Sequence, residues 1–482
     1  MNLLQTTKTK DNKEGPLILG LIGVAAISIF LSLFFSAQAG LLLLAGAWAA
    51  AFSWKYPKRA FWVLLFFAPI LSILKITETL SLVTPLKDFI IIALFLRVVI
   101  FPILRKDDQY RRNVVIAPII LLVIYAIFGV FRADSHLLGI LRLRDILLYV
   151  PMLWIARGLI NTKRDFINFL RVIFSTVALT LFLAVIQIVF FADGAVLRFD
   201  PSNSSWIPRA SSVLAHPNNL GSYLIIILPI MFAYAWRKFK FSYQYIFIVL
   251  TAIVGAVVVY ATYSRSVWVA FAISILALIL INARQKRKIH AKYLIFGAII
   301  IVVGMFSFPR VGNLLRTAID PTYGSNAERL EILTGLVASS TNTSALIGRG
   351  LGDVYQGTGR QINISLSDIV SADDQGVRTA KDRTFVDNAV IKTWTETGLA
   401  GLLIIVFLLW RVLRLAWETA EKENTGQVKT FAAGFLSATL GLVVMSFFLD
   451  IPEVFPIALY WWTFVGILEA LPYLEGKFQS IN

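Results

Sequence analysis

The chain contains no cysteine and only three histidines among its 482 residues. Without cysteine it can form neither a disulfide bond nor a cysteine metal site. The histidines, His136, His216 and His290, are too far apart in the sequence to indicate a zinc cluster. We therefore expect no metal site and no cofactor.

Charged residues are also scarce. They make up 15% of the chain, whereas a soluble domain has about a quarter. Hydrophobic residues make up 58%, and the mean hydropathy is +0.75. Membrane-spanning helices of about 20 residues would use most of the length. The composition therefore predicts an all-α fold, a polytopic membrane helical bundle.

Acidic residues are outnumbered by basic ones, 28 to 45, which gives a net charge of +17. Such a charge is compatible with nucleic-acid binding. The lysines and arginines collect in short loops, however, as the positive-inside rule expects of a membrane protein. We therefore expect membrane lipid, and no nucleic acid, as a partner.

Apolar runs long enough to span a membrane recur along the whole chain and predict about 12–14 spans. They lie at 16–36, 39–54, 60–76, 87–104, 113–131, 138–158, 166–191, 218–236, 243–261, 266–282, 291–308, 388–411, 429–449 and 456–472. Two of them, 39–54 and 60–76, are short, and 138–158 carries charged residues. We expect no cleavable signal peptide before the first run.

The loops between these runs alternate in charge. The basic loops are 55–59, 105–112, 163–164, 237–240, 284–288 and 411–414. All of them are cytoplasmic if the N-terminus is inside. The loops that then face outward are 77–86, 132–137, 192–217, 262–265, 309–386 and 450–455. We expect a multi-pass protein of the inner (cytoplasmic) membrane with both termini in the cytoplasm.

One outward loop is far longer than the rest and divides the chain. We expect N-terminal transmembrane helices at 1–208, a transmembrane core with outward arginines at 209–308, the large extracytoplasmic loop at 309–388, and C-terminal transmembrane helices at 389–482. The loop contains an amphipathic helix pattern at 326–337. A glycine-rich turn at 347–352 lacks the lysine and hydroxyl residue of a P-loop.

Arginines on the outward side are Arg209, Arg265, Arg329 and the pair Arg142 and Arg144. An arginine at the end of a span is often only an interfacial anchor. Arg265 fits that interpretation least, because it lies in a tight turn on the side that the positive-inside rule disfavours. A guanidinium there indicates an anionic ligand such as a phosphate, whose oxygens match its donors.

His216 belongs to the sequence His216-Pro217-Asn218, which ends a loop and begins a helix. It is either a general base or a structural histidine that holds the helix entry.

The exit of the long loop carries two acidic residues. Asp387 is either a base with a pKa raised by partial burial or an ordinary helix N-cap. Glu396 lies nine residues further, inside an apolar run. A buried glutamate there is functional or is paired with an arginine on a neighbouring helix. Gly398 and Gly401 favour close packing of helices.

Taken in order, these blocks resemble the O-antigen ligase and O-antigen polymerase superfamily, membrane glycosyltransferases that act on lipid-linked glycans. The resemblance covers about 209–401 and includes Arg209 to Gly221, Ser264-Arg265, Arg329 with 347–350, and the loop exit. The family's exit is a histidine, then Asn, Ser or Gln, nine residues and Gly-x-x-Gly. Here Asp387 stands at the histidine position, Asn388 follows it, and the spacing is kept.

The resemblance implies transfer of a glycan outside the cytoplasmic membrane. The donor would be a polyprenyl-pyrophosphate-linked glycan, and the acceptor a glycan or a lipid. It implies catalytic roles for Asp387, Arg265 and Arg209. The implied substrate-binding residues are Arg329, His216, Asn218, Asn388 and Glu396. No metal is implied, because the arginines take the role of a cation. Polysaccharide-assembly proteins are compatible partners.

The aspartate in place of histidine leaves alternatives open. An aspartate has an unperturbed pKa of about 3.9, so it needs burial to act as a base. The substitution marks a polymerase, a different acceptor, or a member without catalysis that assists an assembly complex. The resemblance favours a polysaccharide polymerase over an O-antigen ligase. An anion transporter of the same superfamily is a further alternative, but it predicts paired broken helices that the sequence does not display.

Overall fold

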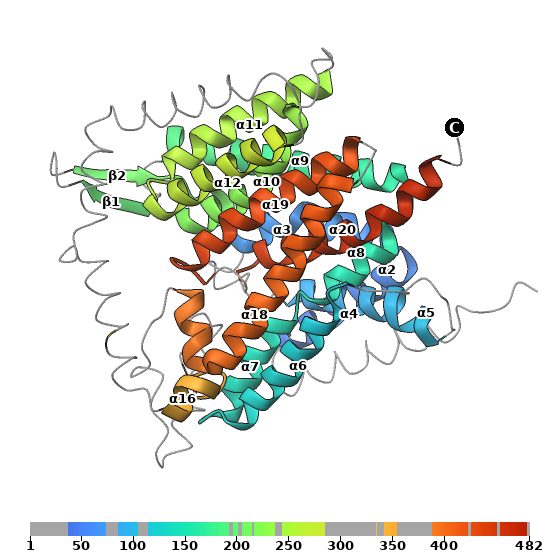
Figure 1. Cartoon of the computed structure of the whole chain (residues 1–482), viewed down its shortest axis with the longest axis vertical. Coiled ribbons are helices and arrows are strands. Elements are labelled where there is room, and N and C mark those ends of the chain that lie inside the picture. Colours follow the sequence, from blue (N-terminus) through green and yellow to red (C-terminus); the bar gives the residue numbers. More distant parts are fainter. Residues whose placement is uncertain are drawn as a thin grey trace, which may run out of the picture.

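The computed structural model describes residues 37–73, 85–104, 114–191, 196–200, 205–214, 216–236, 243–284, 334, 342–353, 388–422, 426–450 and 454–479. Over these residues the chain is a helical bundle with one small β-hairpin (Figure 1). The first helices are α2 (Ala37–Lys55), α3 (Pro57–Ile73), α4 (Leu86–Phe95), α5 (Phe101–Leu104), α6 (Ile116–Phe131), α7 (His136–Leu147), α8 (Pro151–Leu159) and α9 (Lys163–Phe190). The later ones are α10 (Pro217–Ala235), α11 (Tyr243–Ala261), α12 (Arg265–Arg284), α16 (Asn342–Ile347), α18 (Ala389–Lys422), α19 (Gly426–Ser446) and α20 (Ile457–Gln479).

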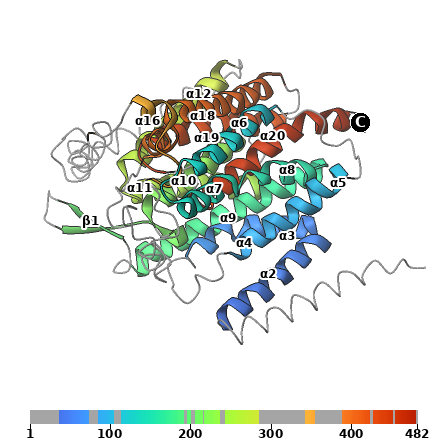
Figure 2. The same ribbon diagram turned by 90° about the horizontal axis from the view of Figure 1, so that it is seen from below.

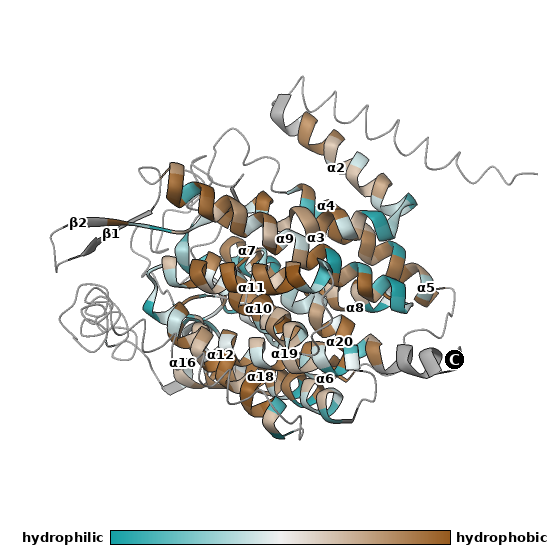
Figure 3. Cartoon of the chain, turned by 90° about the horizontal axis from the view of Figure 1, so that it is seen from above, coloured by the Kyte–Doolittle hydropathy of each residue, from teal (hydrophilic) through white to brown (hydrophobic). Residues whose placement is uncertain are grey.

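Within the described part of the chain, six helices are long and apolar enough to cross a membrane, namely α9, α10, α11, α12, α18 and α19. Shorter apolar helices occur at Gly40–Lys55, Ile116–Phe131 and Ile457–Leu471. Hydrophobic residues predominate along the helices (Figure 3), and many large ones are exposed. On α18, for example, Leu403 and Val406 are more than half exposed. The structure confirms the predicted all-α polytopic membrane bundle.

The predicted runs 16–36 and 291–308 lie outside the described residues, as does the amphipathic helix predicted at 326–337 except for Thr334. Each of the other predicted runs coincides with helix. The run 138–158 is not one span, because α7 and α8 are separate helices. Pro151, which lacks a backbone N–H, takes the first turn of α8, where that donor is not needed.

The loop predicted at 192–217 contains a structure that the sequence analysis did not anticipate. Strands β1 (Val196–Asp200) and β2 (Ser205–Arg209) form an antiparallel hairpin. Val196 pairs with Arg209 and Asp200 with Ser205. The hairpin therefore ends at Arg209, at the base of the loop.

Two ion pairs each join two segments that are expected in the cytoplasm. Lys58 pairs with Asp165 at 2.9 Å, which joins the beginnings of α3 and α9. Arg284 pairs with Glu421 at 3.6 Å, which joins the ends of α12 and α18. Figure 2 places β1 and α16, from loops expected outside, at the opposite end from α5 and the end of α20. This separation is the one that the alternating loop charges predict.

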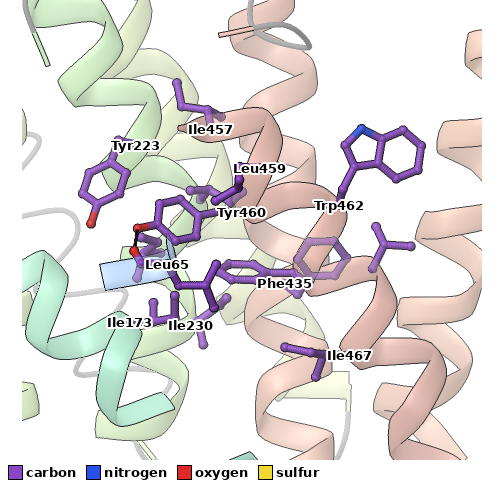
Figure 4. Close-up of a cluster of buried hydrophobic side chains, with 14 of the residues drawn as sticks. Leu65, Ile173, Tyr223, Ile230, Phe435, Ile457, Leu459, Tyr460, Trp462 and Ile467 are labelled. Atoms are coloured by element: carbon purple, nitrogen blue, oxygen red, sulfur yellow. Dashed lines mark hydrogen bonds between the residues drawn. The ribbon is translucent and has the colours of Figure 1, made fainter. Parts of the chain in front are cut away.

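The centre of the bundle is closely packed. Helices α10 and α19 run antiparallel, and a Cβ atom on Gly434 would lie 2.5 Å from the Cα of Ile230. Large side chains from α10, α19 and α20 meet here, including Tyr223, Phe435 and Tyr460 (Figure 4). The hydroxyl of Tyr460 donates to the carbonyl of Leu65 at 2.6 Å. This core fixes the helices whose ends carry the predicted site.

Candidate functional site

Arg209 is held where the hairpin meets the turn between α11 and α12. Its Nε donates to the carbonyl of Thr262 at 2.8 Å, and its Nη2 donates to Oδ1 of Asn218 at 3.3 Å. The backbone N–H of Ala210 donates to the carbonyl of Ala261 at 2.9 Å. Arg265 begins α12, three residues after Thr262. The two arginines predicted to bind an anion therefore lie at the same end of the bundle.

His216 caps the N-terminus of α10. It has extended backbone angles, and its Nδ1 accepts a hydrogen bond from the N–H of Asn218 at 3.2 Å. Burial among protein atoms and the charge of Arg209 lower the pKa of His216 to about 4, although part of the residue is exposed to solvent. The neutral imidazole then carries its proton on Nε2. Its outward nitrogen is a donor, so this geometry favours the structural interpretation over a general base.

Asn388 caps the N-terminus of α18. Its Oδ1 accepts from the N–H groups of Val390 at 3.0 Å and Ile391 at 3.1 Å. Its Nδ2 donates to the carbonyl of Phe447, just beyond α19, at 2.7 Å. Asp387 lies outside the described residues. The N-cap position that one interpretation gave to Asp387 is occupied by Asn388.

Helix α19 packs against α10 and α12, and the segment after it contacts the N-cap of α18. A Cβ atom on Gly441 would lie 2.8 Å from Ile225 of α10 and 2.9 Å from Ser274 of α12. α10 and α12 begin at the end of the bundle where α19 finishes. The segment with Phe447 comes directly after α19, so it lies at that same end. The described parts of the predicted site therefore gather at one end of three packed helices.

Glu396 is 1% exposed and bonds two other elements. Its Oε2 accepts from Nε of Arg142, on α7, at 2.6 Å. Its Oε1 accepts from the N–H of Gly352 at 3.1 Å. This arrangement matches the structural interpretation, in which the glutamate pairs with an arginine on a neighbouring helix.

The glycine-rich turn at 347–352 packs on α18 rather than forming an anion site. Every backbone N–H from Gly348 to Gly352 donates to an oxygen of the protein. In chain order the acceptors are the carbonyls of Ser344 (2.9 Å), Thr395 (2.9 Å), Glu396 (3.1 Å) and Gly129 (2.9 Å), and the Glu396 carboxylate (3.1 Å). Because these donors are used, the turn holds neighbouring segments together instead of binding a phosphate.

The turn fits against a break in α18 at Gly398. This residue has φ +66° and ψ −169°, outside the helical region, and such a φ favours glycine. A Cβ atom on Gly398 would lie 2.4 Å from the N of Gly348. The close approach predicted for Gly398 is present, and the break frees helix carbonyls that the turn then satisfies.

The structure also identifies residues that the sequence analysis did not select. Lys392, on α18, forms an ion pair with Asp450 in the turn after α19. Burial would raise the pKa of Asp450, but the nearby charges of Lys392 and Arg142 lower it below its usual value. The sequence contained one sign of this lysine: Lys392 lies four residues after Asn388 and four before Glu396, which places it on the same helix face as both. Arg329, like Asp387, lies outside the described residues.

A comparison with protein families agrees with the resemblance seen in the sequence. A family model described as O-antigen ligase matches residues 250–406. The matched stretch includes Arg265, Asn388 and Glu396, and it ends after the break in α18. A search of curated proteins finds no significant match. The match supports a function of the O-antigen ligase and polymerase type, in a multi-pass membrane protein.

Proposed function

We propose that the chain is a polysaccharide polymerase. It transfers a glycan from an undecaprenyl-pyrophosphate donor to a sugar hydroxyl on the outer face of the cytoplasmic membrane. The observation that carries the proposal is the gathering of Arg209 and Arg265 at the outer ends of α10 and α12. Helix N-termini bear a partial positive charge, so this region attracts a pyrophosphate.

Each group has a defined part in the reaction. The acceptor hydroxyl oxygen attacks the anomeric carbon of the donor sugar, and the bond from that carbon to the pyrophosphate oxygen breaks. The leaving undecaprenyl pyrophosphate takes the electron pair, and Arg209 and Arg265 stabilise its charge, with Arg329 as a third cation. Asp387 accepts the hydroxyl proton. Stabilisation of developing charge by fixed cations is usually the largest catalytic contribution.

The roles of the remaining residues follow from their contacts. Asn218 orients Arg209 through their hydrogen bond, and His216 holds the entry of α10 and presents a donor at Nε2. Asn388 fixes the start of α18, next to Asp387 in the sequence. Glu396, being bonded to Arg142 and Gly352, supports the site rather than touching substrate.

The first experiment compares cells with Arg265→Ala against wild type for long polysaccharide and for lipid-linked precursors. We expect loss of polymer and accumulation of single repeat units on the lipid. Arg284→Ala is the matched control, because it removes an arginine from the other end of α12, where the side chain is exposed and contacts Glu421 and the Trp417 ring. It should leave both measurements unchanged.

Two other outcomes have clear meanings. Normal polymer in Arg265→Ala cells, with the protein present in the membrane, would remove the pyrophosphate role and make anion uptake the next assay. A wild-type protein that transfers whole glycans to a lipid acceptor without lengthening them would be a ligase instead.

A further inference from the structure

Three residues follow one another at steps of four, beginning at the N-cap of α18 and continuing through its outer segment, Ala389–Thr397. They are Asn388, Lys392 and Glu396, so they share one helix face. Each bonds a different neighbour. These neighbours are the carbonyl of Phe447, the carboxylate of Asp450 and the guanidinium of Arg142. Each of these three side chains therefore bonds the helix to a neighbouring segment.

The rest of α18 cannot give this segment much rigidity. Gly398 interrupts the regular helix immediately after it, and two carbonyls at the break bond the glycine-rich turn instead of helix N–H groups. The position of the outer segment consequently depends on its side-chain contacts. Of the three contacts, only the one at Glu396 is near the break.

The pair of Lys392 and Asp450 is the charged contact nearest the start of α18. The Lys392 side chain is 6% exposed and that of Asp450 22%. A buried charge is costly unless it is paired and hydrogen-bonded, so the two groups hold each other in place. Asp450 follows Phe447 by three residues, and the segment 447–450 thus contacts both Asn388 and Lys392.

We propose that Lys392 is a positioning residue for the transfer reaction. Through its ion pair with Asp450 it holds the start of α18, at Asn388, against the segment 447–450 that follows α19. The inference rests on the proposed function, in which the loop exit at 387–388 supplies the base. Lys392 acts through these neighbours and touches no reacting group.

The inference predicts a particular kinetic change in Lys392→Met. A base displaced by about 1 Å from the reacting hydroxyl lowers the rate about 10²-fold. The arginines that bind the donor are untouched, so KM for the donor should stay within about twofold while kcat falls, as expected for loss of an interaction made in the transition state. Lys392→Arg keeps the charge and should retain most activity. Asp450→Asn should resemble Lys392→Met.

The experiment uses the full-length protein in proteoliposomes with lipid-linked repeat units. Initial rates are measured for wild type, Lys392→Met and Lys392→Arg. A spin label on a cysteine at Val390 reports the mobility of the outer segment, and the absence of native cysteine makes this labelling specific. The control is Lys58→Met, which breaks another inter-helix Lys–Asp pair, with Asp165, at the other end of the bundle.

The proposal is supported if Lys392→Met lowers kcat and makes the label more mobile, while Lys392→Arg and Lys58→Met do neither. Unchanged kcat with an unchanged spectrum would overturn it. A lower kcat with an immobile label would also overturn it, because Lys392 would then act directly. If wild type forms no polymer, the proposed function fails, and the spectra still decide whether Lys392 positions the segment.

Discussion

The buried ion pair between Arg142 and Glu396 should be among the strongest single contacts between helices in the described structure. The side chains are 3% and 1% exposed, and Nε lies 2.6 Å from Oε2. Arg142→Met removes the cation and leaves the carboxylate charged in a buried position. Breaking such a pair costs about 3–5 kcal/mol of folding free energy.

The same helix α18 provides a matched control. Arg414 pairs with Glu418 through the same kind of Nε contact, at 2.8 Å, but these side chains are 56% and 38% exposed. An exposed pair at this spacing contributes only about 0.3–0.5 kcal/mol. Arg414→Met should therefore destabilise the protein roughly tenfold less than Arg142→Met, in free energy, by these two magnitudes.

The assay is unfolding by SDS titration from mixed micelles, which gives the free energy of unfolding of each variant. Arg142→Met combined with Glu396→Gln should recover most of the loss, because replacing both charged partners is often neutral. The amide oxygen of glutamine can still accept from Gly352. The reasoning is refuted if Arg142→Met costs no more than Arg414→Met, or if the double variant is as unstable as the single one.

Other predictions concern the break in α18, the cap of α10 and the topology. Gly398→Ala should abolish folding or activity, because φ is positive at this position and the new Cβ would clash with Gly348. Leu399→Ala, at an exposed neighbouring position, should be tolerated. Protein levels in the membrane and polymer yield test both variants. His216→Asn keeps a side chain that can cap α10 and should retain activity. His216→Ala should lose about 1 kcal/mol of stability. Equal loss of activity in both variants would favour the interpretation of His216 as a general base. Because the pKa of His216 is lowered on folding, its contribution to stability is present above about pH 6.5 and is lost as the pH falls toward about 4, and the pH dependence of unfolding should be flatter in His216→Asn. A cysteine at Asp134 should react with an impermeant reagent added outside intact cells, and one at Lys163 only after lysis; the reverse pattern would invert the topology.

The sequence was sufficient for the class of the fold, because long apolar runs and basic loops report the membrane directly. It was also sufficient to bring Arg209 and Arg265 to one end, since alternating spans place alternating loops on the same side. The β-hairpin before Arg209 was not foreseen. Its pairing depends on backbone bonds across a loop that hydropathy describes only as polar.

Partners of buried charges were harder to predict. The burial of Glu396 implied an arginine on a neighbouring helix, but several arginines were available, and Arg142 lies 254 residues away. Lys392 lies within an apolar run, and its partner Asp450 lies in a distant turn. Neither position indicates in the sequence that the two residues pair. The break at Gly398 is a backbone property, and the spacing of Gly398 and Gly401 in the sequence is equally compatible with a straight helix. The roles given to Asp387 and Arg329 remain predictions.

The reciprocal fit of Gly348 and Gly398 sets a limit on how the large loop can be exchanged between proteins. A Cβ on Gly348 would lie 2.2 Å from the carbonyl of Glu396, and one on Gly398 would strike Gly348 in return. A chimera cut at the apparent ends of the loop would separate these surfaces and join mismatched halves. Grafts intended to change acceptor preference should keep the host's 342–353 and 387–398 together, including the proposed base Asp387, and replace only the residues between them. The contact between Gly348 and Gly398 then stays within the host protein.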